Sequence, residues 1–109
     1  MIELRDITKE LLQVGRRLSK GADELFKLAK EKAEAERNYR QTLAAEILRL
    51  RQEGHPVTLV PDLARGNIAE AKFERDLAEA KYIAGREALD SLRQQASALQ
   101  SILRYQEDA

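Results

Sequence analysis

The sequence predicts an all-α protein in which two long helices fold back on each other as an antiparallel coiled-coil hairpin. Two apolar rows at heptad spacing carry this prediction, one on each side of a segment that contains both prolines. The first row is Leu4, Ile7, Leu11, Val14, Leu18, Leu25 and Leu28. The second row is Ala78, Tyr82, Gly85, Leu89, Leu92, Ala96, Leu99 and Leu103. Steps of three and four place each row on one face of a helix, where it packs against a partner helix.

Composition agrees with long, solvent-exposed helices in a single domain over residues 1–109. Charged residues make up 35% of the 109 residues and aromatic residues only 5%. The absence of cysteine excludes disulfides and thiolate metal sites and is typical of a cytoplasmic protein. The N-terminus lacks the basic and apolar stretches of a signal peptide, and no segment has the roughly 20 apolar residues of a membrane span. We therefore expect no membrane association and no cofactor.

The first helix is predicted over about residues 3–53, which lack proline and are rich in strong helix formers. Gly15 and Gly21 weaken it, and residues 19–23 are the most favourable place for a kink, but we expect a nearly continuous helix. Beyond Leu28 the apolar positions leave the strict heptad, which would fall on polar residues. The expected consequence is that the contact face drifts around the helix near the loop.

A loop over about residues 54–67 and a second helix over about residues 68–105 follow. Gly54 is expected to end the first helix as a left-handed cap. Thr58 is expected to cap a single turn over residues 59–65. Asn67, with Glu70 three residues later, resembles a capping box at the start of the second helix.

Folding the chain about residue 59 places position i opposite roughly 118 minus i, so that Leu28 faces Leu89. In this register residues 2–11 extend past the end of the partner helix and leave Leu4 and Ile7 unopposed. Two helices also bury only one face each, so we expect a homo-oligomer, most simply an antiparallel dimer forming a four-helix bundle. The alternative is a marginally stable monomer with a frayed N-terminus. The residues expected to drive assembly are Leu4, Ile7, Leu11, Val14 and Leu18.

No catalytic or metal-binding arrangement is recognisable, so an enzyme is not expected. His55 is the only histidine, and Glu53 beside it is not expected to orient it for catalysis. Val57, Leu59 and Val60 in the loop are candidates for contact with an unidentified protein partner. The interpretation we favour for these loop residues is a cap over the end of the helical core.

Five basic residues on the first helix suggest a second function, binding of a nucleic-acid backbone. These residues are Lys9, Arg16, Arg17, Lys20 and Lys27. Asp23 interrupts the row, the net charge is zero, and no aromatic residues are interleaved for base stacking. A solvated outer face explains the row as well, so nucleic acid is an alternative that we do not favour.

A set of motifs over roughly residues 35–105 carries a resemblance to known proteins: Tyr39-Arg40, residues 46–58, residues 62–66, Arg75-Asp76, Tyr82 and residues 98–104. With these motifs the chain resembles a group of small phage and prophage proteins of Gram-positive bacteria, predicted helical hairpins that often lack an assigned activity. This resemblance implies a phage-type protein in the cytoplasm of a bacterial host and supplies no catalytic motif.

Together these observations predict a non-enzymatic, self-associating hairpin that acts through protein–protein contacts. Its expected role is as an accessory factor in phage DNA metabolism or as an inhibitor of a host protein. A nucleic-acid-binding module and a structural spacer in a phage assembly are the alternatives.

Overall fold

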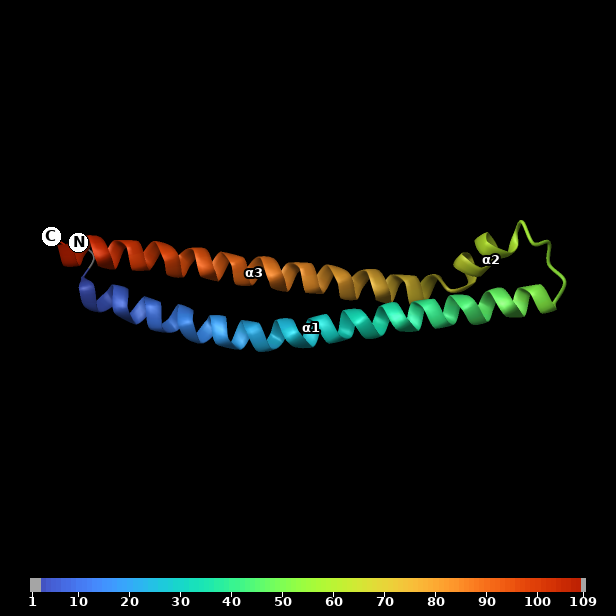
Figure 1. The fold of residues 1–109 in the computed structure, drawn as a ribbon, viewed down its shortest axis with the longest axis horizontal. Helices are drawn as coiled ribbons and strands as arrows, with labels where there is room; N and C mark the ends of the chain where they lie inside the picture. Colours follow the sequence, from blue (N-terminus) through green and yellow to red (C-terminus); the bar gives the residue numbers. More distant parts are fainter. Residues whose placement is uncertain (1–2, 109) are drawn as a thin grey trace. The chain divides into compact units, whose positions relative to one another are not determined.

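The computed structural model describes residues 3–108, which form three α-helices and no strand (Figure 1). Helix α1 spans Leu4–Gln52, α2 spans Val60–Asn67 and α3 spans Ala69–Asp108. The all-α class with two long helices is confirmed. Helix α1 passes through Gly15 and Gly21 without a break, as expected from its many strong helix formers.

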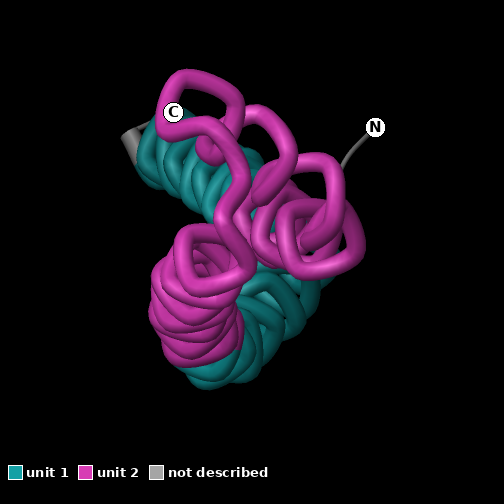
Figure 2. The backbone as a smooth tube through the Cα atoms, turned by 90° about the vertical axis from the view of Figure 1, so that its right-hand side faces the viewer, with its two compact units in different colours: residues 1–27, 83–109 teal, residues 28–82 magenta. Residues whose placement is uncertain are grey.

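The chain divides into two compact units, which are coloured separately in Figure 2. Unit 1 comprises residues 1–27 and 83–109, and unit 2 comprises residues 28–82. Both long helices contribute to each unit. The expectation of one hairpin domain over residues 1–109 stays a prediction.

In unit 1, the N-terminal part of α1 packs antiparallel against the C-terminal part of α3. Ile7 and Val14 of α1 and Leu89 of α3 are buried, with exposed fractions of 4% or less. The other members of both predicted rows within this unit are half-buried, apart from Leu4. Each row therefore forms the face that its heptad spacing predicts.

In unit 2, α1 ends in a Schellman motif built on Gly54. The backbone N–H of Gly54 donates to the carbonyl of Arg51, and the N–H of His55 donates to the carbonyl of Leu50. Gly54 has a φ of 85°, in the left-handed region that glycine adopts without a Cβ penalty. The predicted left-handed cap is confirmed.

Helix α2 packs back onto the end of α1. Val60 and Ala64 of α2 form a buried cluster with Leu50 of α1, and Leu43 and Ile47 pack against this cluster. Leu43, Ile47 and Leu50, which lie outside the strict heptad positions of α1, therefore pack with α2. The heptad positions Lys32, Thr42 and Glu46 stay half-buried beside them, but Arg49 is exposed where Leu50 is buried, so the contact face shifts around the helix near the loop as expected.

The predicted caps of the loop were wrong. Leu59, not Thr58, is the N-cap of α2 and makes no side-chain capping bond. Asn67 does not begin the second long helix but ends α2. Its side-chain amide donates across to the Glu46 carboxylate of α1, at 3.0 Å.

The register of the two helices differs from the predicted one. Gly21 lies against Leu89 in unit 1, and Lys32 lies against Tyr82 in unit 2, so opposed residue numbers add to about 110–114 instead of 118. The reason is that α2 already belongs to the returning arm, which moves the turning point from residue 59 to about residue 56. The expected overhang was therefore wrong, and Ile7 is 2% exposed.

We expect Gly21→Ala to fail to stabilise the protein, although alanine favours a helix by up to about 1 kcal/mol over glycine. A Cβ at Gly21 would lie 2.8 Å from Cδ2 of the buried Leu89. In a Leu89→Ala background the clash disappears, and the same substitution should then stabilise. Thermal unfolding of the four variants of this cycle measures the difference. Equal stabilisation in both backgrounds would show that the contact is not tight.

Candidate functional site

Most residues predicted to drive assembly are used within the chain. Ile7 and Val14 are buried against α3, and Leu11 and Leu18 are half-buried. Leu4 is 50% exposed. A partner can thus reach Leu4, whereas contact with Ile7 or Val14 would require the hairpin to open.

A second row of uncharged residues, not predicted from the sequence, follows α1 outside the buried face. Its members are Leu4, Thr8, Leu12, Gly15, Ser19, Ala22 and Phe26, all exposed and all in unit 1. They recur every three or four residues and span an arc of roughly 80° on the helix. We call this row the outer row of α1. The spacing was visible in the sequence, but the larger side chains of the buried row masked it.

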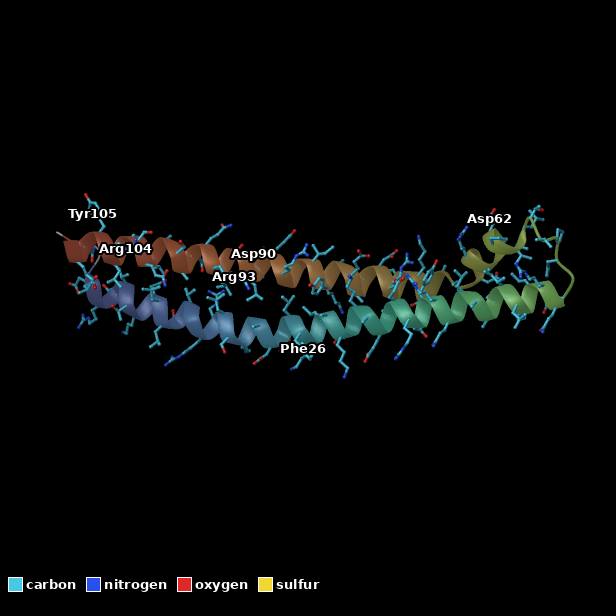
Figure 3. All side chains as sticks on the ribbon, in the orientation of Figure 1. Phe26, Asp62, Asp90, Arg93, Arg104 and Tyr105 are labelled. Carbon is cyan, nitrogen blue, oxygen red and sulfur yellow. The ribbon has the colours of Figure 1, made fainter. Side chains whose placement is uncertain are left out.

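The outer row exposes large apolar side chains. Phe26 is 74% exposed, Leu12 57% and Leu4 50%. The Phe26 side chain points away from α3 (Figure 3). Long uncharged faces are unusual in a chain with 35% charged residues, and exposed apolar patches often mark interaction sites.

The outer row shares one side of unit 1 with a polar row on α3. On the opposite side, Glu10 of α1 lines a shallow groove with Gln95 and Ala98 of α3. The other side of the helix pair in unit 1 carries the outer row of α1. It also carries an exposed row of α3 whose members recur every three or four residues. The α3 row comprises Arg86, Asp90, Arg93, Ser97, Gln100, Arg104 and Glu107.

The five basic residues of the nucleic-acid alternative are exposed on α1, with acidic residues among them. Lys9 and Arg16 line a shallow surface groove together with Asp6 and Glu10. Lys27 forms an ion pair with Glu24 at 3.6 Å. The resulting surface alternates in charge and does not form a continuous basic track.

The loop candidates divide into exposed and buried residues. Val57 is 71% exposed and Leu59 52% exposed, so both are available to a partner. Val60 is 1% exposed in the cluster with Leu50 and Ala64. The assignment of Val60 as a contact residue was wrong, because its side chain caps the core.

A charged cluster surrounds the end of α1. The Arg49 guanidinium bonds to the Glu46 carboxylate and also donates to Glu53 at 2.6 Å. Hydrogen bonds from Arg49 and Asn67 lower the pKa of Glu46 to about 2, and the Glu46 partner raises the pKa of Arg49. His55 Nε2 lies 3.4 Å from the Glu53 carboxylate.

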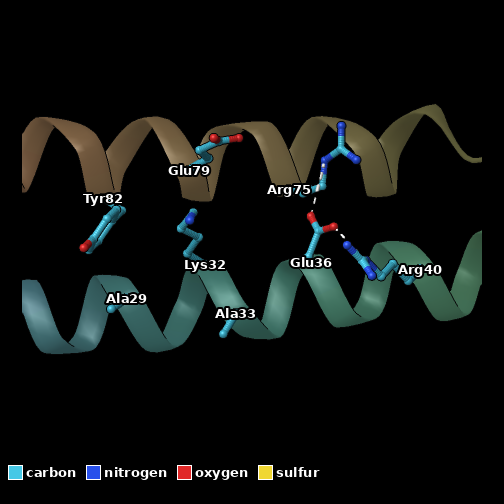
Figure 4. A pocket seen from close by; sticks show the side chains of 8 residues that line it. All are labelled: Ala29, Lys32, Ala33, Glu36, Arg40, Arg75, Glu79 and Tyr82. Carbon is cyan, nitrogen blue, oxygen red and sulfur yellow. Dashed lines mark hydrogen bonds and ion pairs between the residues drawn. The ribbon is translucent and has the colours of Figure 1, made fainter.

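An open groove of about 410 Å³ lies between α1 and α3 in unit 2 (Figure 4). Glu36 lies between Arg40, at 2.9 Å, and Arg75, at 3.8 Å. The Lys32 ammonium lies 5.3 Å from the ring centre of Tyr82. Opposite charges and aromatic faces satisfy one another here, so the groove is best understood as a polar layer of the helix pair.

Within residues 3–108, no group of three or more potential ligand residues is arranged to hold a metal ion. No helix of this described part is long and apolar enough to cross a membrane. In comparisons with known proteins, no family model, curated protein or solved structure matches the chain.

We expect Glu46 to make the folded state sensitive to acid. Its pKa of about 2 lies below the ordinary value of 4.5, so the unfolded chain takes up a proton at this carboxyl first as the pH falls. The stability that Glu46 contributes is present above pH 4.5 and is lost as the pH falls toward 2. Thermal unfolding at pH 6 and pH 2.5 should show a smaller loss for Glu46→Gln than for the natural chain. An equal loss in both proteins would contradict the assignment.

Proposed function

We propose that the chain is a self-associating, non-enzymatic helical protein that acts through protein–protein contacts, with a second copy as its first partner. The observation that supports this most is the outer row of α1, an exposed face without charged residues that continues from Leu4 to Phe26. A helix face of this kind is stable in water when another helix covers it.

The shortage of buried side chains supports the same proposal. Among the described residues, the buried apolar side chains are Ile7, Val14, Leu50, Val60, Ala64, Ile68 and Leu89. Large apolar side chains remain exposed on both long helices, among them Leu12, Phe26 and Phe73. A second copy that covers part of them would bury surface that a single chain leaves in water.

The phage-type part of the proposal rests on the resemblance of residues 35–105 alone. Within it, the chain serves as an accessory factor in phage DNA metabolism or as an inhibitor of a host protein. Val57 and Leu59 are the residues we propose for contact with that further protein, because both are exposed apolar side chains next to the turn.

The mass in solution tests the proposal. Light scattering at micromolar concentration should give about twice the 12.4 kDa of one chain. Because burial of apolar surface drives the assembly, the mass should be the same in low and high salt. A mass of 12.4 kDa over the whole concentration range would overturn the proposed self-association.

A further inference from the structure

We propose that unit 1 binds a second copy of this chain across a two-fold axis that passes beside Gly15 of α1 and Ser97 of α3. The axis brings α1 against α1 of the second copy and α3 against its α3, both antiparallel. The result in this unit is a four-helix arrangement. The inference rests on the proposed self-association and adds the interface and its orientation.

The outer row of α1 is complementary to itself in side-chain size. When two copies meet antiparallel with Gly15 at the centre, opposed residue numbers add to 30. Leu4 then faces Phe26 of the second copy, and Thr8 faces Ala22. Gly15 meets its own copy at the axis and Leu12 faces the small Ser19 beside it, so a larger side chain meets a smaller one near the centre, and large apolar residues meet at both ends.

Gly15 has no function within its own chain that explains its place in a long helix. A Cβ added there would meet nothing within 4 Å, whereas one at Gly21 would meet Leu89. A helix-interior glycine costs roughly 0.5–1 kcal/mol relative to alanine. Close approach of a second backbone gives this exposed glycine a physical reason, as Leu89 does for Gly21.

The polar row of α3 is complementary to itself in charge. When α3 pairs antiparallel with α3 of the second copy and Ser97 lies at the centre, residues whose numbers add to 193 or 194 face each other. Arg86 then faces Glu107 of the second copy. Asp90, which accepts a hydrogen bond from Arg93 of its own chain at 2.8 Å, faces Arg104 of the second copy. Arg93 faces the uncharged Gln100, so no like charges meet along this row. Figure 3 labels Asp90, Arg93 and Arg104 on α3.

The centres of these two patterns coincide in the hairpin. In unit 1, Gly21 lies against Leu89, so opposed numbers within the chain add to about 110. Gly15 is therefore opposite about residue 95, within one helical turn of Ser97. Two rows of unrelated chemistry on two different helices thus share one two-fold axis, which is the requirement for an isologous interface.

The charged flank of the outer row does not by itself favour this orientation. Lys9 lies within reach of Asp23 of the second copy, and the axis makes this pair twice. Within the described part of the chain, neither side chain forms an ion pair of its own. By the same geometry Arg5 lies near Lys27 of the second copy, also twice, and Arg16 meets its own copy beside the axis, so like charges offset the two favourable pairs at low salt. Arg5 and Lys27 each have a carboxylate neighbour in their own chain, Glu3 and Glu24.

Cysteine cross-linking tests the orientation, because the natural chain contains no cysteine. A Ser97→Cys chain should form a disulfide-linked dimer under mild oxidation, since the axis brings the two copies of this position together. Ser91→Cys is the matched control, an exposed serine on the other side of α3. A mixture of Thr8→Cys and Ala22→Cys chains should form a mixed disulfide. Neither chain should cross-link when it is oxidised alone, because in the dimer the two copies of position 8 lie about 21 Å apart along the direction of the helices.

Light scattering of Phe26→Glu and Phe73→Glu provides a second measurement. Both phenylalanines are exposed, but Phe73 lies in unit 2 and outside the proposed face. Phe26→Glu should weaken the dimer at least about tenfold, and Phe73→Glu should leave it unchanged. A dimer in which Ser91→Cys cross-links as well as Ser97→Cys would place the interface elsewhere and leave the self-association standing. A natural chain that is monomeric would overturn both proposals.

Discussion

The register between α1 and the returning arm is the constraint on which the other features depend. The Schellman motif at Gly54 ends α1 at a fixed residue, and the packing of Val60 and Ala64 on Leu50 fixes where the chain begins to return. Within unit 2, the packing of α2 along α1 sets where α3 begins beside α1. A shift of one residue would turn the buried face of α3 by about 100° and expose its leucines.

The all-α class, the two long helices and the glycine cap followed from the sequence because each has a local cause. Heptad spacing, strong helix formers and the need for a left-handed residue are properties of short segments. The register was predicted wrongly because it depends on contacts between distant residues. The sum of 118 came from folding the chain about residue 59, in a segment taken for a loop with a single turn. The eight-residue helix α2 packs on α1, so the chain turns back earlier than predicted. Ile7 is buried, whereas the predicted register left it unopposed.

Polar residues on the contact face of unit 2 select one register for the two helices, because the apolar residues alone would allow several. Arg75 stacks on the Tyr39 ring at 4.0 Å and approaches Glu36, and Asn67 donates to Glu46. Leucine faces leucine in several registers at similar cost, but a charged side chain loses its partner when the helices slide by one turn. The polar layer thus adds specificity more than stability, since half-exposed ion pairs contribute little energy.

The outer row of α1 and the polar row of α3 show why the candidate interface was hidden in the sequence. Each row is weak evidence when it is considered alone: one has a glycine and three small residues, and the other is an ordinary charged surface. They become a single face only when the register places Gly15 near the level of Ser97. A sum of 118 would have placed Gly15 opposite about residue 103, nearly two turns from the centre of the charge pattern. The same intrachain register that buries the leucines therefore also brings the two self-complementary patterns to a common centre.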